Sequence, residues 1–143
     1  MRKILSLFLS IAIILTTGIN AKIDAASNGV QAAWLTTAWS LDWPKTKNNS
    51  TAQKKELIEI LDTLKDTGIN TVMFQVRPYG DAMYKSSINP WSKELTGTQG
   101  KEPGYDPLAF IIQEAHTRGM KVHAWLNPYR VVRSGTDVNV LSS

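Results

Sequence analysis

Two acidic residues of this 143-residue chain follow apolar segments at positions where they could act on a substrate. Asp42 comes after an uncharged segment and precedes Trp43 and Pro44, and Asp81 comes shortly after Arg77. Hydrolysis of a glycosidic bond needs two carboxyl groups, one that protonates the leaving oxygen and one that attacks or activates water. Asp81 is the better catalytic candidate, because the side chain of Asp42 can equally fix its own turn by bonding to the backbone. A structural role stays open for both.

Aromatic side chains are concentrated outside the segments that predict helices. None of the five tryptophans lies in such a segment, and the four tyrosines all lie in expected loops. Flat rings stack on the C–H faces of sugars, while amide and guanidinium groups bond the sugar hydroxyls. We therefore expect a sugar-binding surface that includes Trp39, Trp125 and Tyr129, with ordinary packing as the alternative for each single tryptophan.

Polar side chains alternate with apolar ones in two expected strands. Gln75 and Arg77 share one face of the first strand, and His123 lies on the matching face of the second. A guanidinium at an inward strand end needs a carboxylate or a polar ligand to offset its desolvation. Arg77 therefore binds substrate or pairs with Asp42 or Asp81. Gln75 and His123 either form a hydrogen-bonded interior layer or contact substrate.

Composition excludes several classes of chemistry. The chain has no cysteine, so disulfides, a thiol nucleophile, a Cys-ligated metal and a lipid anchor on an N-terminal cysteine are not expected. Its 16 basic and 12 acidic residues give +4, and without Arg2 and Lys3 the balance is 14 to 12, or +2. This charge predicts no nucleic-acid partner. His116 and His123 lack the spacing of zinc ligands. We predict no metal and no cofactor.

The segment from Met1 to Ala25 is typical of an export signal. Arg2 and Lys3 precede a largely apolar run from Ile4 to Leu15, and small residues follow near Ala25. A helix that spans a membrane needs about 20 apolar residues, so a cleaved leader is favoured over a lasting anchor. We predict a signal peptide at residues 1–25, a protein secreted or held in the cell envelope, and no stable membrane anchor after cleavage. An uncleaved tether is the alternative.

Three strands and two helices alternate in the rest of the chain. The strands are expected at residues 32–40, 71–77 and 121–127. Ser50, with Gln53 in the capping-box position, predicts the start of the first helix, which Gly68 ends. Asp106 and Pro107 predict the start of the second helix, which ends at residue 119. Short turns between helix and strand predict a parallel sheet, with strands adjacent in chain order and both helices on one face.

The polar and aromatic strand residues then face away from the helices, as if toward a barrel axis. Active sites of α/β barrels lie at the carboxyl ends of the strands. The long connection at residues 78–105 is rich in Gly, Pro and aromatic residues, which indicates an ordered, functional loop. Three βα units are too few to close a barrel of eight strands. We predict an incomplete (β/α)8 TIM barrel over residues 32–143, made of its first three βα units and preceded by the signal peptide.

Several blocks of residues, in order along the chain, resemble the N-terminal part of the glycosyl hydrolase-like 10 family domain. The resemblance covers residues 32 to about 132, and the blocks are residues 33–35, 41–44, 74–78, 80–82, 90–92, 95–100, 103–108, 119–120 and 123–130. It implies a barrel hydrolase that acts on glycans, and peptidoglycan glycan strands are a plausible substrate. In barrels of this kind an acid/base carboxylate commonly comes from later strands.

We therefore expect a secreted glycoside hydrolase-like protein that acts on a bacterial polysaccharide, with this chain alone inactive. A non-catalytic glycan-binding protein and an inactive truncated fragment are the alternatives. Asp81 is the expected catalytic residue. The expected substrate-binding residues are Trp39, Asp42, Gln75, Arg77, His123, Trp125, Asn127, Tyr129 and Arg130.

Overall fold

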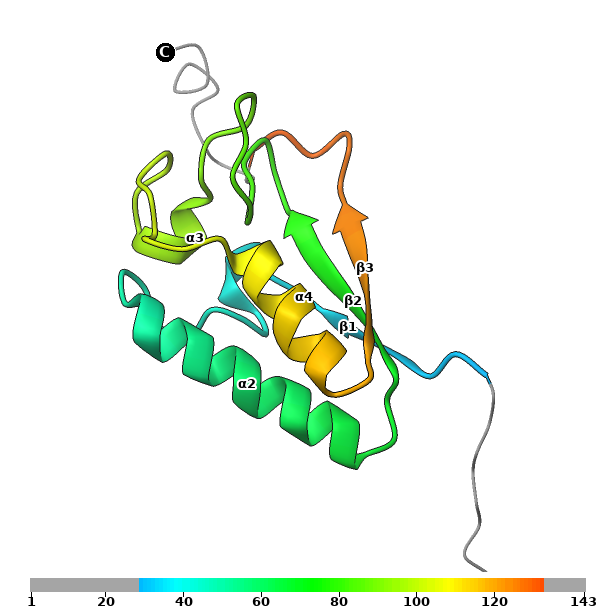
Figure 1. Cartoon of the computed structure of the whole chain (residues 1–143). Coiled ribbons are helices and arrows are strands. Elements are labelled where there is room, and N and C mark those ends of the chain that lie inside the picture. The colour runs from blue at the N-terminus through cyan, green and yellow to red at the C-terminus, as the bar shows by residue number, and fades with distance from the viewer. Residues whose placement is uncertain (1–28, 133–143) are drawn as a thin grey trace, which may run out of the picture.

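The computed structural model describes residues 29–132, which form one parallel sheet covered by helices. The elements are β1 (Ala32–Leu35), the 3-10 turn η1 (Ala38–Ser40), α2 (Ser50–Asp66), β2 (Thr71–Arg77), α3 (Lys93–Thr96), α4 (Pro107–Thr117) and β3 (Lys121–Leu126). The strand order is β1-β2-β3 and both pairings are parallel, which confirms the predicted topology (Figure 1). Within residues 29–132, β1 and β3 each pair with β2 alone.

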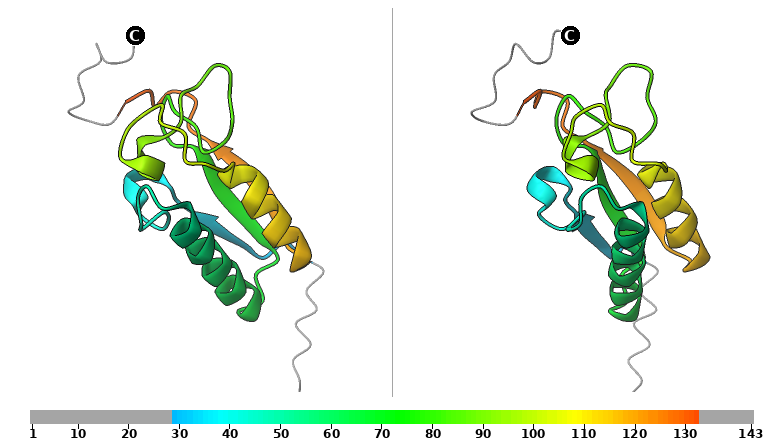
Figure 2. Two further views of the ribbon diagram at one scale, coloured as in Figure 1. Left: turned by 60° about the vertical axis from the view of Figure 1, so that its left-hand side comes forward. Right: turned by 90° about the vertical axis from the view of Figure 1, so that its left-hand side faces the viewer.

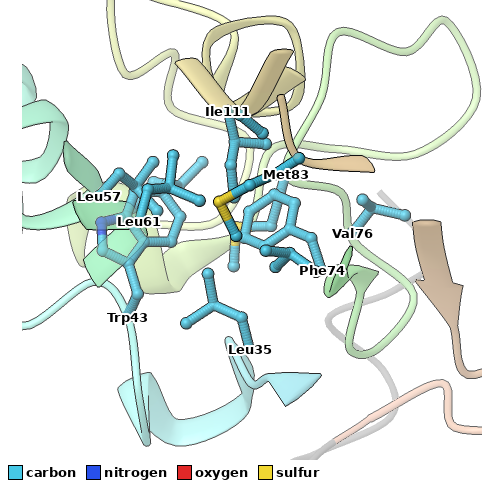
Figure 3. Close-up of a cluster of buried hydrophobic side chains, with 12 residues drawn as sticks. Leu35, Trp43, Leu57, Leu61, Phe74, Val76, Met83 and Ile111 are labelled. Carbon is cyan, nitrogen blue, oxygen red and sulfur yellow. The ribbon is translucent and has the colours of Figure 1, made fainter. Parts of the chain in front are cut away.

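Helices α2 and α4 cover the same face of the sheet, as predicted (Figure 2). The side chains of β2 that point toward them, at positions 72, 74 and 76, are buried. Phe74 packs in one cluster with Leu57 and Leu61 of α2 and with Ile111 of α4 (Figure 3). Burial of these apolar side chains is the main force that holds the helices on the sheet.

The helix ends follow local signals, with one difference at the start of α2. Asp106 caps α4, because its Oδ1 accepts from the backbone N–H of Ala109 at 3.0 Å. The cap of α2 is Asn49, not Ser50: the Asn49 Oδ1 accepts from the N–H of Ala52 at 3.1 Å. The expected capping box is absent because the Gln53 side chain lies in the interior, where its amide donates to backbone carbonyls at 2.7 and 2.8 Å.

The first strand is shorter than expected and ends at Leu35. The segment that follows turns through η1, where Trp39 and Ser40 have positive φ angles of 56° and 54°. Two side chains stabilise this turn. The Asp42 Oδ2 accepts from the N–H of Thr36 at 2.7 Å, and the Gln75 Oε1 accepts from two further backbone N–H groups at 2.8 and 2.9 Å.

The connection between β2 and α4 is ordered and packs into the core. Met83 and Leu95 of this segment are fully buried in the same cluster as the sheet residues. It contains the short helix α3, which the sequence did not indicate, with Ser92 as its cap. The segment therefore forms part of the scaffold at the carboxyl ends of the strands.

The expected signal peptide lies outside the described residues. Among residues 29–132, no helix has the length and apolar character needed to cross a membrane.

Candidate functional site

The sheet face opposite the helices carries the side chains that the sequence singled out. The strand register places Trp34, Met73 and His123 in one row across the three strands, and pairs Gln75 with Trp125 in the next. Trp34 is 64% exposed and His123 is exposed as well, so residues 29–132 leave this face open. The rings of Trp34 and Trp125 meet edge to face, with centroids 4.9 Å apart and planes at 88°. This arrangement fixes the two rings relative to each other on the open face.

Asn127 joins the ends of β2 and β3. Its backbone N–H donates to the carbonyl of Arg77 at 3.0 Å, and its side-chain Nδ2 donates to the carbonyl of Pro78 at 3.2 Å. Its Oδ1 accepts from the indole Nε1 of Trp125 at 3.0 Å. Asn127 therefore orients the ring of Trp125 and ties it to the strand end that carries Arg77.

Arg77 forms no ion pair within residues 29–132, so the structural pair with Asp42 or Asp81, one of the two alternatives that the sequence left open, is not found. Its Nη1 donates to the carbonyl of Asn127 at 3.2 Å, and its Nε donates weakly to the Asn89 Oδ1 at 3.4 Å. Both acceptors are neutral. A bulge in β2 shifts the register so that Arg77 lies opposite Leu126. The Asp42 carboxylate bonds the turn after β1, and neither Asp42 nor Asp81 pairs with the guanidinium in the part of the chain that the structure describes.

Arg77 lines a cavity of about 740 Å³ at the carboxyl end of β2, which we call the Arg77 cavity. The other lining residues are Gly80, residues 86–90, Gln99, Gly100 and Val131. Most of the lining thus comes from the connection between β2 and α4. The sequence predicts a functional loop there but does not indicate which of these residues line a cavity.

Two of the expected binding residues lie in the scaffold. Gln75 is buried, and its Oε1 accepts from the backbone of the β1–η1 turn as described above. The carboxylate of Asp42 bonds the same turn, and its side chain lines smaller cavities beside α2. These contacts fit the structural alternatives that the sequence left open for both residues.

A second aromatic group lies at the end of β1. The rings of Trp39 and Tyr79 meet edge to face at 5.9 Å, and the guanidinium carbon of Arg130 lies 5.4 Å from the centroid of Trp39. Tyr129 is 96% exposed. Trp39 and Arg130 are exposed as well, so all three expected binding residues are accessible from solvent.

Comparison with known proteins decides the family. The family model described as glycosyl hydrolase-like 10 matches residues 29–143, which is most of the chain. The chain belongs to the glycosyl hydrolase-like 10 family.

Two curated glycosyl hydrolases are similar to this chain over most of its length. The chain is 48% identical over 114 residues to glycosyl hydrolase YngK of Bacillus subtilis, a match that covers 79% of this chain and 22% of the relative. It is 49% identical over 119 residues to glycosyl hydrolase DigH of Escherichia coli K12, covering 78% of this chain and 27% of the relative. The chain thus spans about a quarter of the length of these relatives.

Sequence reasoning missed one carboxylate in the family-matched segment, Glu94. The Glu94 side chain is 2% exposed, and its Oε2 accepts from the hydroxyl of Ser40 at 2.9 Å and pairs with the Lys47 Nζ at 3.0 Å. Its second oxygen, Oε1, and the Oδ1 of Asp81 are buried and have no hydrogen-bond partner among residues 29–132. Both partners of Glu94 are distant from it in the sequence, so no local pattern could have shown its burial.

Burial raises the pKa of Asp81 above its ordinary value of 3.8, and the nearby charge of Glu94 acts in the same direction. Hydrogen bonding by Ser92 and by the backbone of Tyr79 and Lys93 opposes this shift without cancelling it. A raised pKa suits a general acid, although Asp81 does not line the Arg77 cavity. Within residues 29–132, no three His, Cys, Asp or Glu side chains gather where they could hold a metal ion.

The raised pKa of Asp81 predicts a pH-dependent effect of Asp81→Asn. The folded state holds the Asp81 proton more tightly than the unfolded state, so this residue lowers the free energy of unfolding as pH rises from 3.8 through the folded pKa. Asparagine does not titrate, so the variant gains stability relative to the unchanged chain as pH rises through this window. Urea unfolding of both proteins at a series of pH values measures this difference. A variant that loses stability relative to the unchanged chain as pH rises would contradict the prediction.

Proposed function

We propose that this chain forms the glycan-binding part of a glycoside hydrolase active site, and that its substrate is a bacterial polysaccharide, the glycan strands of peptidoglycan. The observation that carries the proposal is the open aromatic face of the sheet in a chain of the glycosyl hydrolase-like 10 family. Trp34 and Trp125 offer flat apolar surface there, and Asn127 ties the ring of Trp125 to the strand end that carries Arg77 and its cavity. Sugar sites combine these two kinds of surface.

In this proposal the side chains at the strand ends have separate roles. Trp125 stacks on a sugar ring, and Arg77, Asn127, Tyr129 and Arg130 orient its hydroxyl or carboxylate groups. Asp81 is the proposed proton donor among the described residues, and its raised pKa supports that role. We also propose that the protein acts outside the cytoplasm, since the segment from Met1 to Ala25 is typical of an export signal and peptidoglycan lies there.

A non-catalytic glycan-binding protein is the second candidate. The hydrogen bonding and burial of the carboxylates at the strand ends favour this candidate, because Asp42 bonds a backbone N–H and Asp81 is 2% exposed. Hydrolysis requires two carboxyl groups that flank the scissile bond, and neither of these two residues presents a free carboxylate on the open face. The open face and the Arg77 cavity need no acid in order to bind a sugar.

Substitution of Trp125 tests glycan binding. We expect Trp125→Ala to weaken binding of peptidoglycan glycan oligosaccharides to the 143-residue chain roughly tenfold, because the stacking ring is lost. Trp125→Phe is the matched control: it keeps a flat ring, loses the bond to Asn127, and should retain most of the affinity. Isothermal titration calorimetry measures the dissociation constants, and circular dichroism checks the fold. Equal affinity of all three proteins would contradict the role of Trp125.

Turnover separates the two candidate functions. A chimera in which residues 29–143 replace the matching segment of the Bacillus subtilis relative should release shorter glycans if this segment supplies part of a hydrolase site. The same chimera with Asp81→Asn should lose turnover if Asp81 donates the proton. A folded chimera that binds glycan without cleaving it would support the binding-protein alternative.

A further inference from the structure

The guanidinium of Arg77 has unused hydrogen-bonding capacity. An arginine side chain carries five N–H donors. Within residues 29–132 two of them are used, by Asn89 and by the carbonyl of Asn127, which leaves three. The two bonded acceptors hold the guanidinium plane at the wall of the Arg77 cavity, so its free donors are presented in a fixed orientation.

The described lining of the Arg77 cavity carries one positive charge and no negative charge. Among residues 29–132, Arg77 is the one charged side chain that lines the cavity, and no lining residue in this range is acidic. The volume of about 740 Å³ lies within the range of about 300 to 1,000 Å³ typical of ligand pockets. A partly desolvated cation of this kind is stabilised by an anion, and a planar guanidinium matches the two oxygens of a carboxylate.

We propose that the Arg77 cavity is a subsite for a sugar that bears a carboxylate, and that Arg77 makes the protein select acidic over neutral glycans. This inference rests on the proposed glycan-binding function. The two oxygens of the carboxylate accept from the free N–H groups of Arg77. The polar side chains of Ser87, Asn89 and Gln99 in the same lining are the partners for the ring hydroxyls.

The experiment measures binding of the full 143-residue chain to tetrasaccharides that differ in charge. The first probe alternates N-acetylglucosamine with N-acetylmuramic acid, whose carboxylate is on a lactyl ether. The second is the same oligosaccharide with its carboxyl groups converted to methyl amides. The third alternates N-acetylglucosamine with glucuronate, whose carboxylate is on the ring. The fourth is neutral tetra-N-acetylglucosamine.

We expect the lactyl or the ring carboxylate probe to bind about 10- to 100-fold more tightly than the neutral probes, the value expected for a charged hydrogen bond. The two acidic probes show which source of carboxylate the cavity accepts. The methyl amide probe tests the charge on the unchanged protein, so the result does not depend on how a variant folds. Equal binding of acidic and neutral probes would overturn the subsite while leaving the glycan-binding function intact.

Variants assign the preference to Arg77. Arg77→Gln should remove the preference for acidic probes, and Arg77→Lys, which keeps the charge but loses the planar fork, should retain part of it. Lys121→Gln is the matched control, because it removes one positive charge from an exposed position at the opposite end of the sheet. A preference that survives Arg77→Gln would overturn the role of Arg77. If none of the four probes binds, the proposed function itself fails and this inference fails with it.

Discussion

Trp43→Ala is expected to lower the free energy of unfolding by about 3–5 kcal/mol, the usual cost of removing a large buried aromatic side chain. Trp43 is completely buried, its ring lies 5.8 Å from that of Phe74, and its indole Nε1 donates to the carbonyl of Gln53 at 3.0 Å. The substitution therefore leaves a cavity between the sheet and α2 and also removes a buried hydrogen bond. Equilibrium urea unfolding followed by circular dichroism measures the change.

Trp39→Ala provides the control with the same change of side chain. Trp39 is 49% exposed and contacts Tyr79 edge to face, so its removal should cost no more than about 1.5 kcal/mol. The two variants separate stability from binding, because Trp39 is one of the expected substrate-binding residues and Trp43 is not. Similar losses of stability in both variants would contradict the packing described here.

Gln75→Leu is expected to destabilise the protein by about 2–6 kcal/mol, since it leaves two buried N–H groups without an acceptor at about 1–3 kcal/mol each. These are the backbone N–H groups of Thr37 and Ala38, which lie 2.9 and 2.8 Å from the Gln75 Oε1. Leucine has a similar volume, so the loss reports the hydrogen bonds more than packing. Thermal and urea unfolding measure it.

Gln75→Leu should also displace the turn that carries Trp39. Glycan binding should therefore weaken, although Gln75 itself does not contact the sugar. Thr37→Val is the control: it removes a single hydroxyl that donates to the Gln75 carbonyl at 2.9 Å and should cost about 1 kcal/mol. A Gln75→Leu protein as stable as Thr37→Val would show that water replaces the lost acceptor.

Local signals in the sequence were sufficient for most elements. Asp106 and Pro107 start α4, and Gly68 and Gly119 adopt the positive φ angles of 86° and 68° that follow helix ends. The residues of β2 match the prediction, and β3 ends one residue earlier than expected. These features depend on neighbours within a few residues, which a single sequence displays.

The differences arise where contacts between distant residues decide the structure. β1 ends at Leu35 because Gln75, which belongs to the next strand, bonds the backbone of the turn. Gln53 leaves the capping position because its amide bonds Thr46 and Leu95 across the loops. Residue types and local spacing do not reveal such partners.

In the candidate site, too, the features set by local sequence were predictable and those set by distant contacts were not. Alternation along the strands correctly placed Trp125 and His123 on the face away from the helices. It could not show that the side chains of Asp42 and Gln75 accept hydrogen bonds from backbone N–H groups, or that both acceptors bonded by Arg77 are neutral. Those findings depend on the turn after β1 and on the loop after β2, whose courses are set by tertiary packing.

The order of the strands has a consequence for biosynthesis. Each strand after the first pairs with one that is translated before it: Phe74 of β2 lies beside Leu35 of β1, and Ala124 of β3 lies beside Phe74. Polypeptides leave the ribosome at about 5–20 residues per second, which is slow compared with the formation of local structure. Each βα unit that emerges therefore meets a pairing edge and an apolar surface that already exist. The sheet can grow at one edge in the direction of translation, without waiting for any segment still to be made.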